Sequence, residues 1–208
     1  MAKPLIALDL DDTLYEHFSL LVNWHNATYG SRLTLADNHP FSPRHWGTPA
    51  LQRQTLARWN APSVPVAAQR VRAFFDTPQF KNAAPFKGAQ SVLDDLAQTH
   101  TIVIVTARDL FLEDFTRTWL RQKFGGVISD VVLTARYNLD GHSKDKLDVL
   151  LRRGATCVID DDLELCPRAT KAGIAAIVFG DYPWNQDKGN SSIRRAKNWD
   201  DVRKYIQS

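Results

Sequence analysis

The chain has 208 residues, of which 44 % are hydrophobic and 24 % charged, and its formal net charge is +3. This composition is typical of a globular protein, and so small a charge does not favour nucleic acid as a partner. The first apolar run is short and ends in acidic residues, which predicts neither a secretory signal nor a membrane span. Because Cys157 and Cys166 lack metal or redox spacing, we expect reduced thiols and a cytoplasmic protein.

The first predicted element is a buried strand that ends in a cluster of carboxylates. Its sequence is Leu5-Ile6-Ala7-Leu8, and Asp9-Leu10-Asp11-Asp12-Thr13 follows directly. Like charges a few ångströms apart repel by about 4 kcal/mol per pair at an intermediate dielectric constant, so a counter-charge is required. At the carboxyl end of a parallel strand this is most simply a metal cation. The alternative interpretation is a turn with a helix N-cap, for which Asp and Thr are both favoured.

Residues 15–85 predict a helical cap inserted between the first strand and the rest of the sheet. Phe18, Leu21 and Val22 have helical spacing, and residues 51–59 and 64–75 read as two further helices. Residues 34–49 contain several prolines and predict a loop. Five aromatic residues of this region could stack on a nucleobase or form the core of the cap: Trp24, Trp46, Trp59, Phe74 and Phe75.

Residues 86–208 alternate between helical and strand patterns. We expect strands at 101–105, 131–133, 156–159 and 174–179, and helices at 88–98, 111–124, 144–153, 163–172 and 199–206. Such alternation predicts an α/β fold with a Rossmann-like parallel sheet and helices on both faces. Residues 1–14 and 86–208 would then form one catalytic core.

Polar groups follow several predicted strands. Because the carboxyl ends of parallel strands lie at one edge, these groups should converge: Asp9 and Asp11, Thr106, Asp160 and Asp161, with Lys144 at the start of a nearby helix. This set suits phosphoryl transfer, in which Asp9 attacks phosphorus. Asp11 would protonate the leaving alkoxide and later activate a water molecule. Thr106 and Lys144 would hold the phosphate oxygens, with Mg²⁺ as the counter-charge.

Each of these side chains also has a purely structural interpretation. Thr106 alone would be an ordinary strand residue, and Lys144 alone an exposed helix lysine. Arg108 could contact substrate or pair with a surface acid.

The order of these motifs resembles that of the haloacid dehalogenase-like (HAD) phosphatase superfamily. Four further segments are similar to the 5′(3′)-deoxyribonucleotidase-type branch: Pro85-Phe86-Lys87-Gly88-Ala89, Val105-Thr106-Ala107-Arg108, Val158-Ile159-Asp160-Asp161-Asp162 and Tyr182-Pro183-Trp184-Asn185. The resemblance implies a metal with three protein ligands: the Asp9 carboxylate, the main-chain carbonyl of Asp11 and the Asp161 carboxylate. Asp160 would support this site. Motif position selects Lys144 over Lys146 as the phosphate lysine. Ala107 stands where the mammalian branch has a serine; it is expected to be a phosphate-binding residue with Thr106 and Lys144, but without the hydrogen bond of the serine hydroxyl.

The expected function is therefore a Mg²⁺-dependent phosphomonoesterase with an aspartyl-phosphate intermediate. The resemblance favours a (deoxy)nucleoside monophosphate as the small phosphorylated substrate. The alternatives are a sugar-phosphate or other metabolite phosphatase, a phosphomutase, and a phosphate-binding module without turnover. No membrane partner is expected.

Overall fold

The computed structural model describes residues 2–37, 49–135, 143–186 and 193–207. The chain divides into two compact units, one formed by Met1–Tyr15 with Ala84–Ser208 and the other by Glu16–Ala83. The roles of catalytic core and cap, expected for residues 1–14 with 86–208 and for 15–85, stay predictions. Among the described residues no helix is both long and apolar enough to cross a membrane.

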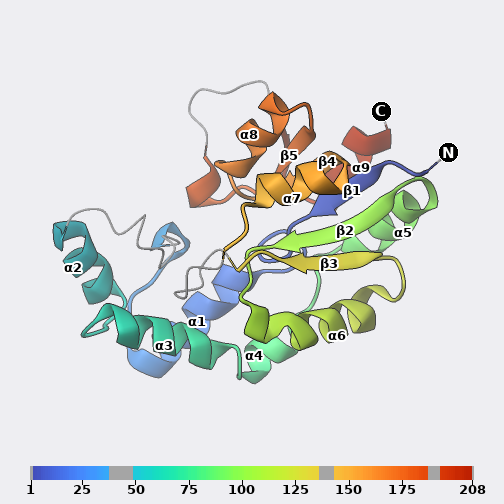
Figure 1. Cartoon of the computed structure of the whole chain (residues 1–208). Coiled ribbons are helices and arrows are strands. Elements are labelled where there is room, and N and C mark those ends of the chain that lie inside the picture. The colour runs from blue at the N-terminus through green and yellow to red at the C-terminus, as the bar shows by residue number, and fades with distance from the viewer. Residues whose placement is uncertain (1, 38–48, 136–142, 187–192, 208) are drawn as a thin grey trace. The chain divides into compact units, whose positions relative to one another are not determined.

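The first unit is built on a six-stranded sheet in the order β3-β2-β1-β4-β5-β6 (Figure 1). All neighbouring strands pair in parallel. This confirms the predicted α/β fold with a Rossmann-like parallel sheet. The strands are β1 (Leu5–Leu8), β2 (Thr101–Thr106), β3 (Asp130–Leu133), β4 (Ala155–Asp160), β5 (Ala175–Phe179) and β6 (Arg194–Ala196).

Helices cover both faces of this sheet. They are α5 (Ala89–Thr99), α6 (Glu113–Phe124), α7 (Lys146–Arg153), α8 (Leu165–Lys171) and α9 (Trp199–Gln207), with short 3₁₀ turns η2 (Leu110–Leu112) and η3 (Pro183–Asn185). In Figure 1, α7 and α8 lie on one side of the sheet, and α5 and α6 on the other. Because β1 is covered on both faces, Ile6, Ala7 and Leu8 are all fully buried, which explains why the strand is a continuous apolar run.

The register of β1 brings three strand ends to one edge of the sheet. Leu8 pairs with Ile104 of β2 and with Ile159 of β4. Asp9 follows directly and donates its backbone N–H to the carbonyl of Ile159 at 2.9 Å. The polar residues after β1, β2 and β4 therefore start from neighbouring positions.

The second unit is helical and has its own core. It contains α1 (His17–Tyr29), η1 (Leu35–Asp37), α2 (Pro49–Arg58), α3 (Val64–Phe74) and α4 (Pro78–Lys81). Trp59 and Phe74 are buried, and the Trp24 ring lies 5.6 Å from that of Phe74. Phe75 stacks on His17 at 6.0 Å. These four aromatic residues pack within the unit, while Trp46 lies outside the described residues.

One strand and one short α-helix have no counterpart in the sequence expectation. The strand β6 was not predicted, because its three residues include Arg194 and Arg195 and show no apolar alternation. The helix α4 was not predicted either, because it has only four residues and follows Thr77, whose hydroxyl caps it by accepting a hydrogen bond from the Phe80 N–H.

Candidate active site

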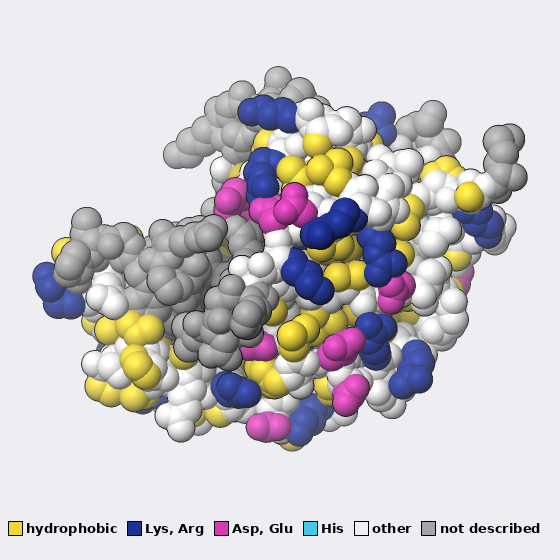
Figure 2. Space-filling model, in the orientation of Figure 1, with side chains coloured by type: hydrophobic (Ala, Val, Ile, Leu, Met, Phe, Trp, Pro, Cys, Tyr) yellow, Lys and Arg dark blue, Asp and Glu magenta, His cyan; other side chains and the backbone are white. Residues whose placement is uncertain are grey.

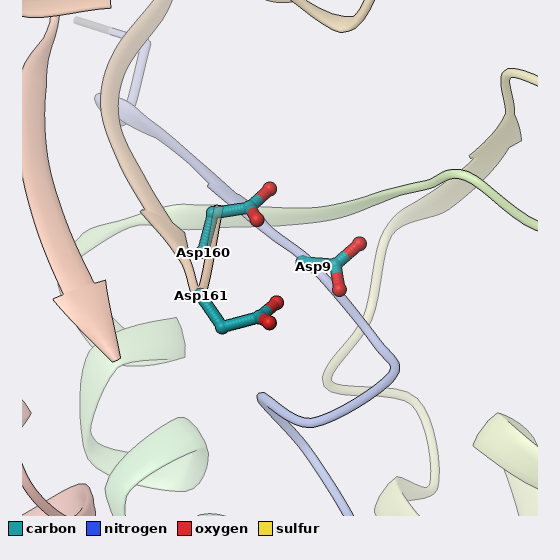
Figure 3. A group of neighbouring side chains, drawn as sticks. All are labelled: Asp9, Asp160 and Asp161. Carbon is teal, nitrogen blue, oxygen red and sulfur yellow. The ribbon is translucent and has the colours of Figure 1, made fainter. Parts of the chain in front are cut away.

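Three carboxylates gather at the carboxyl edge of the sheet and form what we call the acidic triad: Asp9, Asp160 and Asp161. One oxygen from each lies within 4.8 Å of the others. Asp9 comes from the end of β1, and the other two come from the end of β4 (Figure 3). Asp9 and Asp160 are buried, whereas Asp161 is partly exposed. The structure thus brings together residues that are about 150 positions apart in the sequence.

The ammonium beside the triad belongs to Lys146. Its Nζ donates to Asp9 Oδ1 at 2.6 Å and to Asp160 Oδ2 at 2.8 Å, and the side chain is buried. Burial lowers the pKa of Lys146, but the two carboxylates more than offset this and raise it well above its usual value. Lys146 therefore stays charged.

The expectation that Lys144 would occupy this place is wrong. Lys144 is exposed, and its backbone N–H donates to the carbonyl of Thr134 at 2.8 Å. The helix starts two residues later than expected because Asp145 caps it, accepting a hydrogen bond from the Leu147 N–H at 2.8 Å. Lys146 is consequently the first residue of α7. An Asp one position before a helix is a recognised N-cap, so this start could have been predicted from the sequence.

The triad carries more negative charge than Lys146 can balance. Burial raises the pKa of Asp9 to about 7, against the opposing effect of the Lys146 ammonium. Burial and the charges of Asp160 and Asp9 also raise the pKa of Asp161. Carboxylate oxygens are the ligands that Mg²⁺ and similar hard cations prefer. The three carboxylates and their excess charge therefore fit a divalent cation.

Asp11 lies in a second, separate network. Arg108 Nε and Nη2 donate to its two carboxylate oxygens at 3.0 and 2.7 Å, and the Tyr15 hydroxyl donates to Oδ1 at 2.7 Å. Arg108 also donates to Tyr15 Oη and, through Nη1, to Thr116 Oγ1 at 3.0 Å. Of the two interpretations left open for Arg108, the structure supports pairing with an acid, and that acid is Asp11. No pattern in the sequence predicts the part that Tyr15 takes in this network.

The turn after β1 places Asp12 in the left-handed region, with φ of +57°. The backbone N–H of Asp12 donates to the carbonyl of Tyr15 at 2.9 Å, which closes this turn. Asp tolerates such a conformation better than most residues other than glycine. The turn after β1 therefore accommodates an aspartate at position 12 and does not require a glycine there.

Thr106 and Ala107 lie where β2 ends. Thr106 is fully buried, and its Oγ1 accepts a hydrogen bond from the backbone N–H of Arg108 at 3.3 Å. Its carbonyl accepts from the N–H of Thr134 at 2.8 Å, which joins the ends of β2 and β3. Ala107 is half-buried directly after it. Phosphate binding by these two residues stays a prediction.

Comparison with known proteins supports the resemblance seen in the sequence. No family model matches the chain. A curated nucleotidase from Clostridium acetobutylicum is 30 % identical over 118 residues, which are 56 % of this chain and 56 % of that protein. The match therefore spans only about half the length of that relative.

Two solved structures are similar over nearly their whole length. A haloacid dehalogenase-like family hydrolase from Streptococcus pneumoniae has a TM-score of 0.68 at 17 % identity and covers 99 % of both chains. A Bacillus subtilis protein described as a HAD-hydrolase, solved bound to magnesium, has a TM-score of 0.65 at 12 % identity and covers 100 % of both chains. The chain thus has the fold of the HAD-like hydrolases and phosphatases.

Proposed function

We propose that this protein is a Mg²⁺-dependent phosphomonoesterase that acts through an aspartyl-phosphate on Asp9. The observation that carries the proposal is the acidic triad with Lys146 in contact with Asp9 and Asp160. A phosphate dianion can approach such a group of carboxylates only where positive charge compensates the repulsion. A bound Mg²⁺ ion would supply that compensation and polarise the phosphoryl group.

The first step is attack of an Asp9 carboxylate oxygen on phosphorus. A bond forms between this oxygen and phosphorus, and the bond from phosphorus to the substrate alkoxide breaks. Asp11, in its protonated form, gives the alkoxide a proton, so that the leaving group departs as a neutral alcohol. Lys146 stays charged beside Asp9 and stabilises the negative charge that accumulates on the transferring group.

The second step releases inorganic phosphate and restores Asp9. A water molecule attacks phosphorus, the bond between phosphorus and the Asp9 oxygen breaks, and Asp11 takes the proton from water. The two hydrogen bonds from Arg108 hold the Asp11 carboxylate in place for this step. Thr106, the main chain at Ala107 and Lys146 would hold the remaining phosphate oxygens.

We infer a small substrate, with a nucleoside monophosphate as the first choice. The partial match to a curated nucleotidase supports this choice. On the face seen in Figure 2, Lys and Arg side chains lie among acidic and hydrophobic ones, which favours a small molecule over a nucleic acid. We also propose that the helical unit Glu16–Ala83 acts as a cap. The proposed location of the protein is the cytoplasm.

The test is a panel of phosphomonoesters that includes nucleotides and sugar phosphates, assayed with Mg²⁺ for the wild type and for Asp9→Asn. We expect phosphate release by the wild type, with nucleotides near the top of the ranking, and no measurable release by the variant. Equal turnover by the two proteins would remove Asp9 from the mechanism. A ranking with nucleotides last would favour a sugar-phosphate or other metabolite phosphatase.

A further inference from the structure

An aromatic pair after β5 contacts the proposed cation site. The indole Nε1 of Trp184 donates a hydrogen bond to Asp161 Oδ2 at 2.6 Å. Lys146 contacts the other two carboxylates of the triad, Asp9 and Asp160. An indole N–H is a neutral donor, so it can fix the orientation of a carboxylate while leaving its negative charge in place.

The second member of the pair, Tyr182, contacts the loop that follows β1. Its ring stacks on that of Trp184 with centroids 4.4 Å apart and an interplanar angle of 4°. Its hydroxyl donates to the backbone carbonyl of Asp12 at 2.9 Å. The stacked pair therefore connects the loop that follows Asp9 and Asp11 to the carboxylate that follows β4.

The segment that carries the two rings is held by a buried asparagine. Asn185 Nδ2 donates to the carbonyl of Phe179 at 2.8 Å, and its Oδ1 accepts from the Tyr182 N–H at 3.0 Å. Arg195 Nη2 donates to the carbonyl of Asn185 at 2.6 Å and to its Oδ1 at 3.1 Å. Gly180 has φ of +82°, and a Cβ there would overlap the Tyr182 ring. These contacts fix the place of the pair independently of the triad.

We propose that Trp184 is a positioning residue for the cation site, and that Tyr182 supports it by holding its ring. By hydrogen bonding one oxygen, the indole limits Asp161 to one rotamer and prepares the carboxylate to bind a cation together with Asp9. This inference rests on the cation site of the proposed function. Outer partners of metal ligands affect metal affinity, and their loss typically weakens it by about 10- to 100-fold.

The test measures Mn²⁺ binding by the full chain, with free Mn²⁺ followed by electron paramagnetic resonance. Trp184→Phe keeps an aromatic ring for stacking but removes the N–H, so we expect its dissociation constant for Mn²⁺ to rise about tenfold. Trp24→Phe is the matched control, because Trp24 is another partly buried indole, in the other unit, and should bind Mn²⁺ as the wild type does. Tyr182→Phe should weaken binding by a smaller factor.

A double-mutant cycle tests whether Trp184 acts through Asp161. In an Asp161→Ala background, the additional Trp184→Phe substitution should leave the residual Mn²⁺ affinity unchanged. An equal loss in both backgrounds would contradict the proposal. Unchanged thermal unfolding of Trp184→Phe in the absence of metal would exclude a general folding defect.

The outcomes also separate this inference from the proposed function. If the wild type binds Mn²⁺ and hydrolyses phosphomonoesters while Trp184→Phe binds Mn²⁺ equally well, only the positioning role is overturned. If Trp184→Phe weakens Mn²⁺ binding but the wild type hydrolyses no phosphomonoester, the positioning role stands and the proposed function falls. A wild type that binds no Mn²⁺ would overturn the positioning role, whereas the phosphomonoester panel with Mg²⁺ would still decide the proposed function.

Discussion

Arg108 and Asp11 form a two-point ion pair across 97 positions of sequence, with Nε and Nη2 of the guanidinium on separate carboxylate oxygens. The Arg108 side chain is only 3 % exposed, whereas that of Asp11 is 24 % exposed. The buried arginine is thus the fixed partner, and its Nη1 donates a hydrogen bond to Thr116 Oγ1 of α6. A planar guanidinium defines both the position and the orientation of a carboxylate, which a point charge cannot do.

The first prediction is that Arg108→Lys impairs catalysis. An ammonium is a point charge and cannot reproduce the planar two-point contact with Asp11, so the Asp11 carboxylate should lose its fixed position. Small misplacements of reacting groups can cost about 100-fold in rate, and we expect kcat to fall at least about tenfold. The measurement is steady-state hydrolysis of the best substrate in the panel, with thermal unfolding as a check on folding. Arg117→Lys on α6, where the side chain is 39 % exposed and pairs with Glu113, should behave like the wild type. A folded Arg108→Lys protein with unchanged kcat would contradict this prediction.

The second prediction separates the two candidate lysines. Lys146→Met removes the ammonium that contacts Asp9 and Asp160, so both carboxylates lose their charge partner. Removing one member of a buried ion pair costs about 3–5 kcal/mol, which should appear as a lower free energy of unfolding in EDTA together with a large loss of activity. The exposed Lys144 is the matched control, and Lys144→Met should change the unfolding free energy by less than about 0.5 kcal/mol. Loss of activity in the Lys144 variant alone would restore the original expectation.

The third prediction concerns the charge of the triad. Asp161→Asn keeps an oxygen that can accept the Trp184 hydrogen bond but removes one negative charge. Without divalent cations the variant should unfold at a higher temperature than the wild type, because repulsion from Asp9 and Asp160 disappears. Added Mg²⁺ should raise the unfolding temperature of the wild type and have much less effect on the variant. Differential scanning calorimetry in EDTA and in Mg²⁺ gives both comparisons, and equal stabilisation of the two proteins by Mg²⁺ would exclude Asp161 as a ligand.

The fourth prediction concerns His25 in the helical unit. The side chain is fully buried, and its Nδ1 lies 2.7 Å from Ser31 Oγ. Burial, with a contribution from the charge of Arg70, lowers the pKa of His25 from 6.5 to about 4. The neutral form is therefore favoured in the folded protein. The associated stability is fully present above about pH 6.5 and is lost as the pH falls towards 4, by up to about 3 kcal/mol.

Urea unfolding at pH 7 and pH 4.5 tests this linkage. His25→Asn keeps a side chain able to hydrogen bond to Ser31 but does not titrate, so its unfolding free energy should vary less between the two pH values. His100→Asn, at the end of α5, serves as the control and should follow the wild type. If His25→Asn and the wild type lose equal stability on acidification, His25 does not contribute to the pH dependence.

Much of the sheet and the triad could be predicted because each depends on local patterns. Apolar runs followed by Asp9 and by Asp160 identify the ends of β1 and β4, and the parallel arrangement then brings these acids to one edge. Lys146 was missed because the choice between two nearby lysines depends on where α7 begins. The N-cap Asp145 carries that information, whereas motif position alone selects Lys144.

The contacts of Arg108 and Trp184 could not be predicted, because they depend on tertiary geometry. Arg108 follows a strand end and could have faced either substrate or solvent until the position of Thr116 on α6 was known. Trp184 belongs to a segment that resembles the nucleotidase-type branch, and that resemblance assigns it no partner. Its hydrogen bond to Asp161 depends on the course of the backbone from Gly180 to η3. No periodic pattern in the sequence predicts that course.

The central place of β1 has a consequence for how the protein is made. During synthesis Leu5–Leu8 leaves the ribosome before both of its neighbours in the sheet, Thr101–Thr106 and Ala155–Asp160. The strand must therefore remain without its native pairing until much of the polypeptide has been translated. Long-range pairing of this kind slows folding and leaves an apolar segment exposed to aggregation. Chaperone demand in cells should consequently be set by this segment, and nascent chains that stop before residue 100 should be especially prone to aggregate.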